Sequence, residues 1–248
     1  MKDKRIQLWA GFLLLFVIYH FPEFYNELWI AAVFKIGFLA VSFFVARYQG
    51  LKNLGGFGLN LHKSWVLHLA TGILTGFCFF ALSVVISDAA RFEKVISIEN
   101  LFVIIKQLPL ILLMTVFPSV AEDILTRGYL FAHLKQKMTG NIFIMLSAAV
   151  YVLNHIWRLG QHPSVLIYLF VLGIALAFAL WKTGSLWLAF GIHWGSNIAF
   201  ESTNSFVKTT QITQGHQTTW VLACSFLLMF IFLALILRRY RPASVMND

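Results

Sequence analysis

The feature that most constrains this chain is a series of apolar runs, each about 18 residues or longer, that recurs along its whole length. A run of this kind spans a bilayer as an α-helix, because a helix satisfies its own backbone polar groups. Hydrophobic residues make up 59% of the 248 residues and charged residues 12%, which excludes an ordinary soluble domain. We therefore expect an all-α, polytopic membrane helix bundle that forms a single domain over residues 1–248.

The apolar runs divide into eight expected spans. The first is interpreted as an uncleaved span, since Lys2, Lys4 and Arg5 precede it and no small-residue cleavage site follows. Residues 47–63 are expected to lie along the interface as a short amphipathic piece, and residues 87–107 as an interfacial helix. The spans are expected at residues 6–21, 28–46, 65–86, 108–134, 141–157, 163–181, 185–199 and 220–237.

The positive residues orient the spans. An even number of spans places both termini on one side, and most of the 19 Lys and Arg residues fall in loops on that side. Cytoplasmic loops carry such an excess, so both termini are expected in the cytoplasm. The same placement explains the formal charge of +9 without a nucleic-acid partner. The expected location is the plasma (inner) membrane of a prokaryote.

Strongly polar residues inside the runs concentrate in three of the eight spans. Ionisable residues at membrane depth are energetically costly, and they mark a functional site by default. At about 1.5 Å per residue, the polar groups of the three spans lie at similar depths near the bilayer middle, so they can meet. They are Glu122, Asp123 and Arg127 in the fourth span, Asn154 and His155 in the fifth, and His193 and Asn197 in the seventh.

Helical spacing predicts how some of these side chains point. His193 and Asn197 are four residues apart and share a face. Glu122 and Asp123 are adjacent and point about 100° apart, so at most one of them aims at a given cavity.

Other polar residues are expected to lie outside the site. Asn154 is expected to point away from the face of its neighbour His155. His20 fits a packing or interface position, and Lys35 is expected to snorkel or to pair with another group.

Two histidines and a carboxylate from three helices support hydrolysis of a carbonyl bond in two ways. Without a metal, the carboxylate takes a proton from water with help from one histidine, while the other histidine and an Asn stabilise the oxyanion. With a metal, His155, His193 and Glu122 would bind zinc and leave one position for water. A third possibility is non-catalytic: a transporter with a proton or ion site, or an immunity or scaffold protein.

Three motifs carry a resemblance to a known family. The sequence reads Glu122-Asp123-x-x-x-Arg127, then Tyr151-x-x-x-His155, then His193-x-x-x-Asn197. This order resembles the CPBP (CAAX protease and bacteriocin-processing, Abi) family, whose pattern is EExxxR, an aromatic–xxx–His motif and HxxxN or HxxxD. The match runs from about residue 118 to 199, and the family-like core is expected at about residues 108–203. The chain departs from the pattern by having Asp as the second acid and Tyr as the aromatic residue.

The resemblance implies an intramembrane endopeptidase that acts on a membrane-associated peptide or protein within the lipid bilayer. It implies a glutamate-type enzyme without a metal cofactor, with the zinc metalloprotease as the alternative. Carried over by position, Glu122 and His155 would activate water, and His193 and Asn197 would stabilise the oxyanion. The supporting residues would be Asp123, Arg127 and Tyr151.

Overall fold

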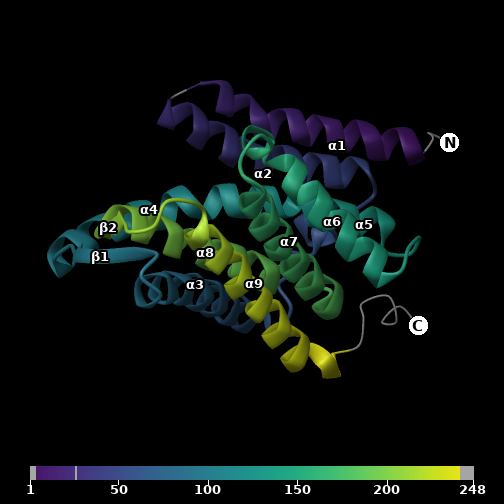
Figure 1. Cartoon of the computed structure of the whole chain (residues 1–248). Helices are drawn as coiled ribbons and strands as arrows, with labels where there is room; N and C mark the ends of the chain where they lie inside the picture. The colour runs from purple at the N-terminus through teal and green to yellow at the C-terminus, as the bar shows by residue number, and fades with distance from the viewer. Residues whose placement is uncertain (1–3, 26, 241–248) are drawn as a thin grey trace.

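The computed structural model describes residues 4–25 and 27–240 and confirms the predicted all-α bundle (Figure 1). The described chain also contains a two-stranded sheet of β1 (Glu93–Ile98) and β2 (Val207–Gln211). The α-helices are α1 (Lys4–His20), α2 (Leu28–Tyr48), α3 (Trp65–Ala89), α4 (Leu101–Asp123), α5 (Tyr129–Leu134), α6 (Gly140–Asn154), α7 (Pro163–Thr183), α8 (Leu186–Phe206) and α9 (Gln217–Ile236).

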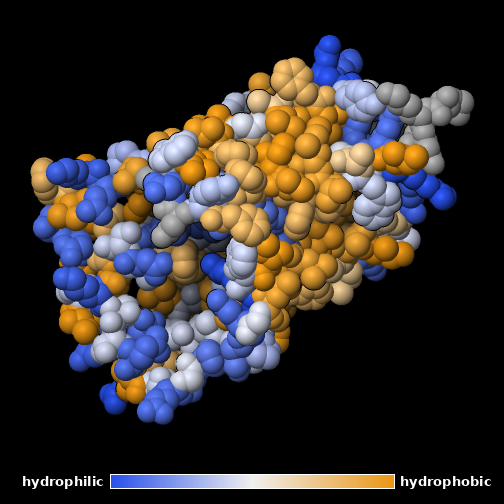
Figure 2. All heavy atoms as spheres, turned by 90° about the horizontal axis from the view of Figure 1, so that it is seen from above, coloured by the Kyte–Doolittle hydropathy of each residue, from blue (hydrophilic) through white to orange (hydrophobic). Residues whose placement is uncertain are grey.

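Each of the eight expected spans corresponds to a helical segment, with α4 and α5 forming one long segment. Within the described residues, 6 segments are long and apolar enough to cross a membrane: α1, α2, α3, α4–α5, α7 and α9. The helix α6 has only 15 residues, and α8 carries several polar side chains. Hydrophilic atoms gather toward both ends of the molecule, and a broad apolar surface separates them (Figure 2).

The first turn of α1 and the last turn of α9 lie at the same end of the bundle (Figure 1). This arrangement agrees with an even number of passes. The assignment of that end to the cytoplasm stays a prediction.

The expected interfacial helix over residues 87–107 is wrong. There β1 pairs antiparallel with β2, from Glu93 opposite Gln211 to Ile98 opposite Val207. The β-branched residues of β1 favour an extended strand. The following helix begins at Leu101, seven residues earlier than expected, and it contains Pro109 in its interior.

The segment 47–63 also differs from the expected interfacial piece. It contains a short 3-10 helix, η2 (Leu54–Phe57), and the Phe57 side chain is fully buried. The Leu186 amide donates a hydrogen bond of 2.8 Å to the Gly58 carbonyl. Tertiary packing therefore draws this segment into the end of the bundle, against the start of α8.

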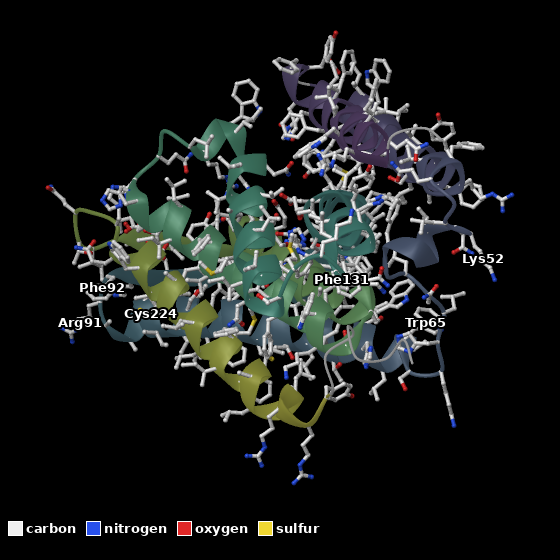
Figure 3. All side chains as sticks on the ribbon, turned by 90° about the vertical axis from the view of Figure 1, so that its right-hand side faces the viewer. Lys52, Trp65, Arg91, Phe92, Phe131 and Cys224 are labelled. Atoms are coloured by element: carbon white, nitrogen blue, oxygen red, sulfur yellow. The ribbon has the colours of Figure 1, made fainter. Side chains whose placement is uncertain are left out.

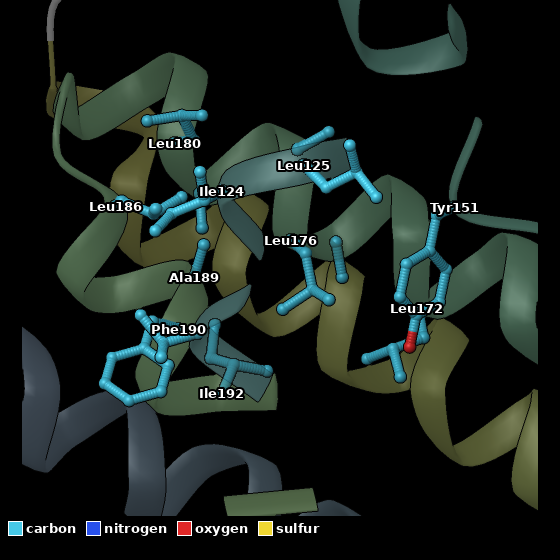
Figure 4. Close-up of a cluster of buried hydrophobic side chains, with 14 of the residues drawn as sticks. Ile124, Leu125, Tyr151, Leu172, Leu176, Leu180, Leu186, Ala189, Phe190 and Ile192 are labelled. Atoms are coloured by element: carbon cyan, nitrogen blue, oxygen red, sulfur yellow. The ribbon is translucent and has the colours of Figure 1, made fainter. Parts of the chain in front are cut away.

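The helix α8 lies in the middle of the bundle and contacts α3, α4 and α7. Figure 4 shows the buried apolar cluster that joins α7 and α8 to the segment that follows α4. Ile124 and Leu125 belong to this cluster and are fully buried. The core thus fixes the chain directly after Glu122 and Asp123.

The close packing of α3 on α8 depends on glycine. A Cβ at Gly76 would meet the Ile192 carbonyl oxygen and the Ser196 amide nitrogen far inside contact distance. A Cβ at Gly37 in α2 would meet no atom within 4 Å. Small residues at helix contacts let the two backbones approach each other in membrane proteins.

We expect Gly76→Ala to lower the free energy of unfolding by about 1–3 kcal/mol or more, because the added methyl group forces α3 away from α8. The matched variant Gly37→Ala is expected to be neutral, or to stabilise by up to about 1 kcal/mol. Thermal unfolding of both variants in the same lipid or detergent checks the difference. Equal behaviour of the two variants would contradict the proposed helix contact.

Candidate active site

The two adjacent acids lie where α4 ends, and both are buried. Glu122 is 6% exposed and Asp123 is 0% exposed. A π-helical turn, η3 (Ile124–Gly128), follows them and leads into α5. Such single π-turns inside α-helices often occur at functional sites. The expectation that at most one of the two acids aims at a given cavity agrees with the structure, since Glu122 lines two cavities and Asp123 lines neither of them.

Glu122 lies between side chains from two other helical segments. Its Oε1 atom accepts a hydrogen bond of 2.9 Å from Asn154 Nδ2 and lies 3.5 Å from His155 Nδ1. Its Oε2 atom lies 3.6 Å from His193 Nε2. The structure therefore brings polar residues from all three predicted spans together at the Glu122 carboxylate.

Asp123 is the partner of a cation and of a histidine. Its Oδ1 atom pairs with Arg127 Nη1 and accepts a hydrogen bond of 2.9 Å from His193 Nδ1. Arg127 is fully buried and lies over the Tyr151 ring, 4.9 Å from the centroid. The Tyr151 hydroxyl lies 3.4 Å from His193 Nε2. The ion pair and the two rings hold one side of the site in place.

The hydrogen-bond partners assign the proton positions on both histidines. A carboxylate or carbonyl oxygen only accepts, so His193 Nδ1 donates to Asp123, and His155 Nδ1 donates to the Tyr151 carbonyl at 2.8 Å. In the neutral form each ring then carries its lone pair on Nε2. The His193 lone pair faces Glu122 and Tyr151.

Two cavities meet at Glu122. One of about 290 Å³ is lined by residues of α3, α4 and α6 to α9, including Glu122, Tyr151, His155, His193 and Asn197. A second of about 210 Å³ is lined by Glu122 and His155 together with Tyr19 and Glu23.

Asn197 Nδ2 donates a hydrogen bond of 2.9 Å to Ser119 Oγ, which leaves its second N–H available. A larger apolar cavity of about 600 Å³ lies between α1 and α2 and includes none of these residues.

The same residues are the candidates for a metal site. Among the described residues, no group of three or more His, Cys, Asp or Glu side chains is arranged to hold a metal ion. His155 Nδ1 and His193 Nδ1 face hydrogen-bond acceptors, so only their Nε2 atoms are free for a ligand. Glu122, His155 and His193, the ligands of the zinc alternative, are thus not arranged around a common ion position.

Residues 104–199 match the family model described as "Rce1-like: Type II CAAX prenyl endopeptidase Rce1-like". The chain is similar to that family over this part, which we call the Rce1-like stretch. The match confirms the resemblance predicted from the three motifs, and it contains all seven residues named there. Comparison with curated proteins and with solved structures gives no match.

Helical spacing gave a wrong prediction for one residue inside the Rce1-like stretch. Asn154 was expected to point away from the site, and this is wrong, since its amide contacts Glu122. The helix α6 ends at Asn154, and His155 leaves the helical conformation with φ −87 and ψ 55. Two adjacent residues can therefore reach the same carboxylate, which is not possible while both are helical.

Further contacts come from outside the Rce1-like stretch. His20 in α1 was expected to be a packing residue, but its Nε2 atom lies 3.1 Å from Asn154 Oδ1. Lys35 in α2 was expected to snorkel or to pair with another group, and it pairs. Its Nζ atom donates to the Tyr19 carbonyl at 2.8 Å and lies 3.8 Å from Glu23 Oε1. No motif connects these positions to Glu122, so no sequence signal points to them.

Proposed function

We propose that the chain is an intramembrane endopeptidase of the glutamate type, which hydrolyses a peptide bond of a membrane-associated peptide or protein. The Rce1-like match supports a CAAX-type endopeptidase in general. The observation that carries the finer proposal is the convergence of Glu122, His155 and His193 on one cavity. We further propose that the chain forms one domain and that it lies as a multi-pass protein in a prokaryotic plasma membrane.

Glu122 is the base in this proposal. A water molecule in the 290 Å³ cavity gives its proton to the Glu122 carboxylate as its oxygen attacks the scissile carbonyl carbon. Oε1 is occupied by the Asn154 amide, so Oε2 is the oxygen free to take the proton. His155 presents its Nε2 lone pair and orients the same water by accepting its second hydrogen.

His193 and Asn197 stabilise the oxyanion of the tetrahedral intermediate. In this proposal His193 carries a proton on both nitrogens throughout the cycle: Nδ1–H donates to Asp123, which balances the positive charge, and Nε2–H donates to the oxyanion. Asn197 donates its second N–H. The proton held by Glu122 then passes to the leaving amine nitrogen as the C–N bond breaks, so the cycle returns the carboxylate to its starting state.

The zinc metalloprotease is the alternative mechanism. In it, Glu122, His155 and His193 would hold the ion, which would supply an activated water. We expect peptide cleavage by the reconstituted protein to be unchanged after chelation, with less than one zinc per chain, because Glu122 alone supplies the base. A stoichiometric zinc that is lost together with activity would overturn the glutamate mechanism.

The activity assay uses the full chain in proteoliposomes. A farnesylated peptide with a C-terminal CAAX sequence and a membrane-spanning peptide serve as substrates, and mass spectrometry identifies the cleaved bond. Cleavage of either peptide supports an endopeptidase. A chain that cleaves neither peptide but carries protons across the vesicle membrane would instead be a transporter.

A further inference from the structure

Two buried basic side chains lie in the N-terminal hairpin, α1–η1–α2, and the proposed mechanism does not use them. The 3-10 helix η1 spans Phe21–Phe24. His20 is 4% exposed and Lys35 is 7% exposed. The hairpin lies outside the Rce1-like stretch. Figure 3 shows α1 and α9 on opposite sides of the bundle, so the hairpin covers a flank of the core.

A continuous chain of hydrogen bonds joins this hairpin to the proposed base. Glu23 Oε2 lies 2.7 Å from His20 Nδ1, and His20 Nε2 lies 3.1 Å from Asn154 Oδ1. Asn154 Nδ2 then donates to Glu122 Oε1 at 2.9 Å. Trp157 Nε1 donates to the same Glu23 oxygen at 2.9 Å. The acid of the hairpin and the acid of α4 are thus separated by one imidazole and one amide.

The donors and acceptors in this chain have one consistent arrangement. The Glu122 oxygen accepts from the Asn154 amide nitrogen, so the Asn154 oxygen faces His20 and must accept from its Nε2–H. A neutral His20 would then place a lone pair on Nδ1 opposite the Glu23 carboxylate. At 2.7 Å, one proton must lie between them. The other Glu23 oxygen, Oε1, lies 3.8 Å from Lys35 Nζ.

We propose that His20, charge-paired with Glu23, is a positioning residue for hydrolysis: it fixes the Asn154 amide, which holds Glu122 Oε1 and leaves Oε2 for water. This inference rests on the proposed function and deepens it. It makes the N-terminal hairpin part of the active site. His20 is absent from the lining of both cavities at Glu122, so its proposed effect passes through Asn154.

The first test is His20→Phe, measured as peptide cleavage by the full chain in proteoliposomes. The ring contact with Phe16, at 4.3 Å between centroids, is kept, while both hydrogen bonds are removed. We expect kcat to fall about tenfold, with KM unchanged. His20→Gln retains one N–H donor for Asn154, and we expect it to recover part of the lost kcat.

The matched control is His133→Phe. His133 Nε2 lies 2.9 Å from Gln49 Oε1, so it also ties the N-terminal hairpin to the core, but at the other end of the bundle. We expect its kcat to equal that of the wild type. A loss equal to that of His20→Phe would mean that the hairpin acts by stability alone, and the inference would be overturned.

A double-mutant cycle tests whether His20 acts through Asn154. If it does, adding His20→Phe to Asn154→Ala causes no further loss, whereas independent residues give losses that multiply. Losses of kcat that multiply would contradict the inference, and so would a kcat of His20→Phe within twofold of the wild type. Neither outcome would affect the role of Glu122 as the base. Absence of cleavage by the wild-type chain would instead remove the proposed function, and this inference with it.

Discussion

Glu122→Gln is expected to reduce peptide cleavage by about 10²- to 10⁴-fold, which is the range that general acid–base catalysis contributes. The amide of Gln keeps the size of the carboxylate and still offers an oxygen to the Asn154 amide. It cannot take a proton from water. Initial rates in proteoliposomes, with thermal unfolding of the same samples, separate lost chemistry from lost folding.

Glu201 provides the matched control, because its carboxylate lines the same cavity from α8. Glu201→Gln is expected to lose far less activity, since no described histidine pairs with Glu201 within 4 Å. Unchanged cleavage by Glu122→Gln would rule out Glu122 as the base. The inactive Glu122→Gln chain, crosslinked in its native membrane, is also expected to retain its peptide and so identify the substrate.

Arg127→Met is expected to lower the free energy of unfolding by about 3–5 kcal/mol. Both Arg127 and Asp123 are 0% exposed, and the substitution leaves the Asp123 charge buried without its cation. The measurement is thermal or chemical unfolding of the wild type and the variant in one lipid environment.

The double variant Asp123→Leu with Arg127→Met separates the effect of the ion pair on stability from its effect on activity. Apolar replacement of a whole buried ion pair is often close to neutral for stability, so most of the lost stability should return. Activity should not return, because His193 Nδ1 loses its acceptor. A double variant as unstable as Arg127→Met would show that packing, and not charge, explains the effect.

The fold was largely predictable because apolar length alone identifies helices in a membrane chain. Hydropathy does not show where a helix ends, however. The strand β1 and the early start of α4 were missed for this reason, since residues 87–107 mix charge with β-branched residues that suit either structure. The end of α6 at Asn154 was missed in the same way.

The site was predictable as far as residues within one helix or one motif determine it. Spacing along α8 places His193 and Asn197 on one face, and the acids of α4 were visible as charges in an apolar run. The bond between His20 and Asn154 joins residues 134 positions apart. No local pattern encodes such a contact, because it depends on how the N-terminal hairpin packs on the core.

The surroundings of the buried acids bear on whether the proposed reaction needs protons from outside the active site. Glu23 lies near Lys35 and His20, and Asp123 pairs with Arg127, whereas Glu122 contacts two histidines and an amide. In the proposed mechanism each cleavage takes one proton from water and returns one to the new amine, so Glu122 ends each cycle as a carboxylate. A cycle of this kind needs no supply of protons from an ion gradient.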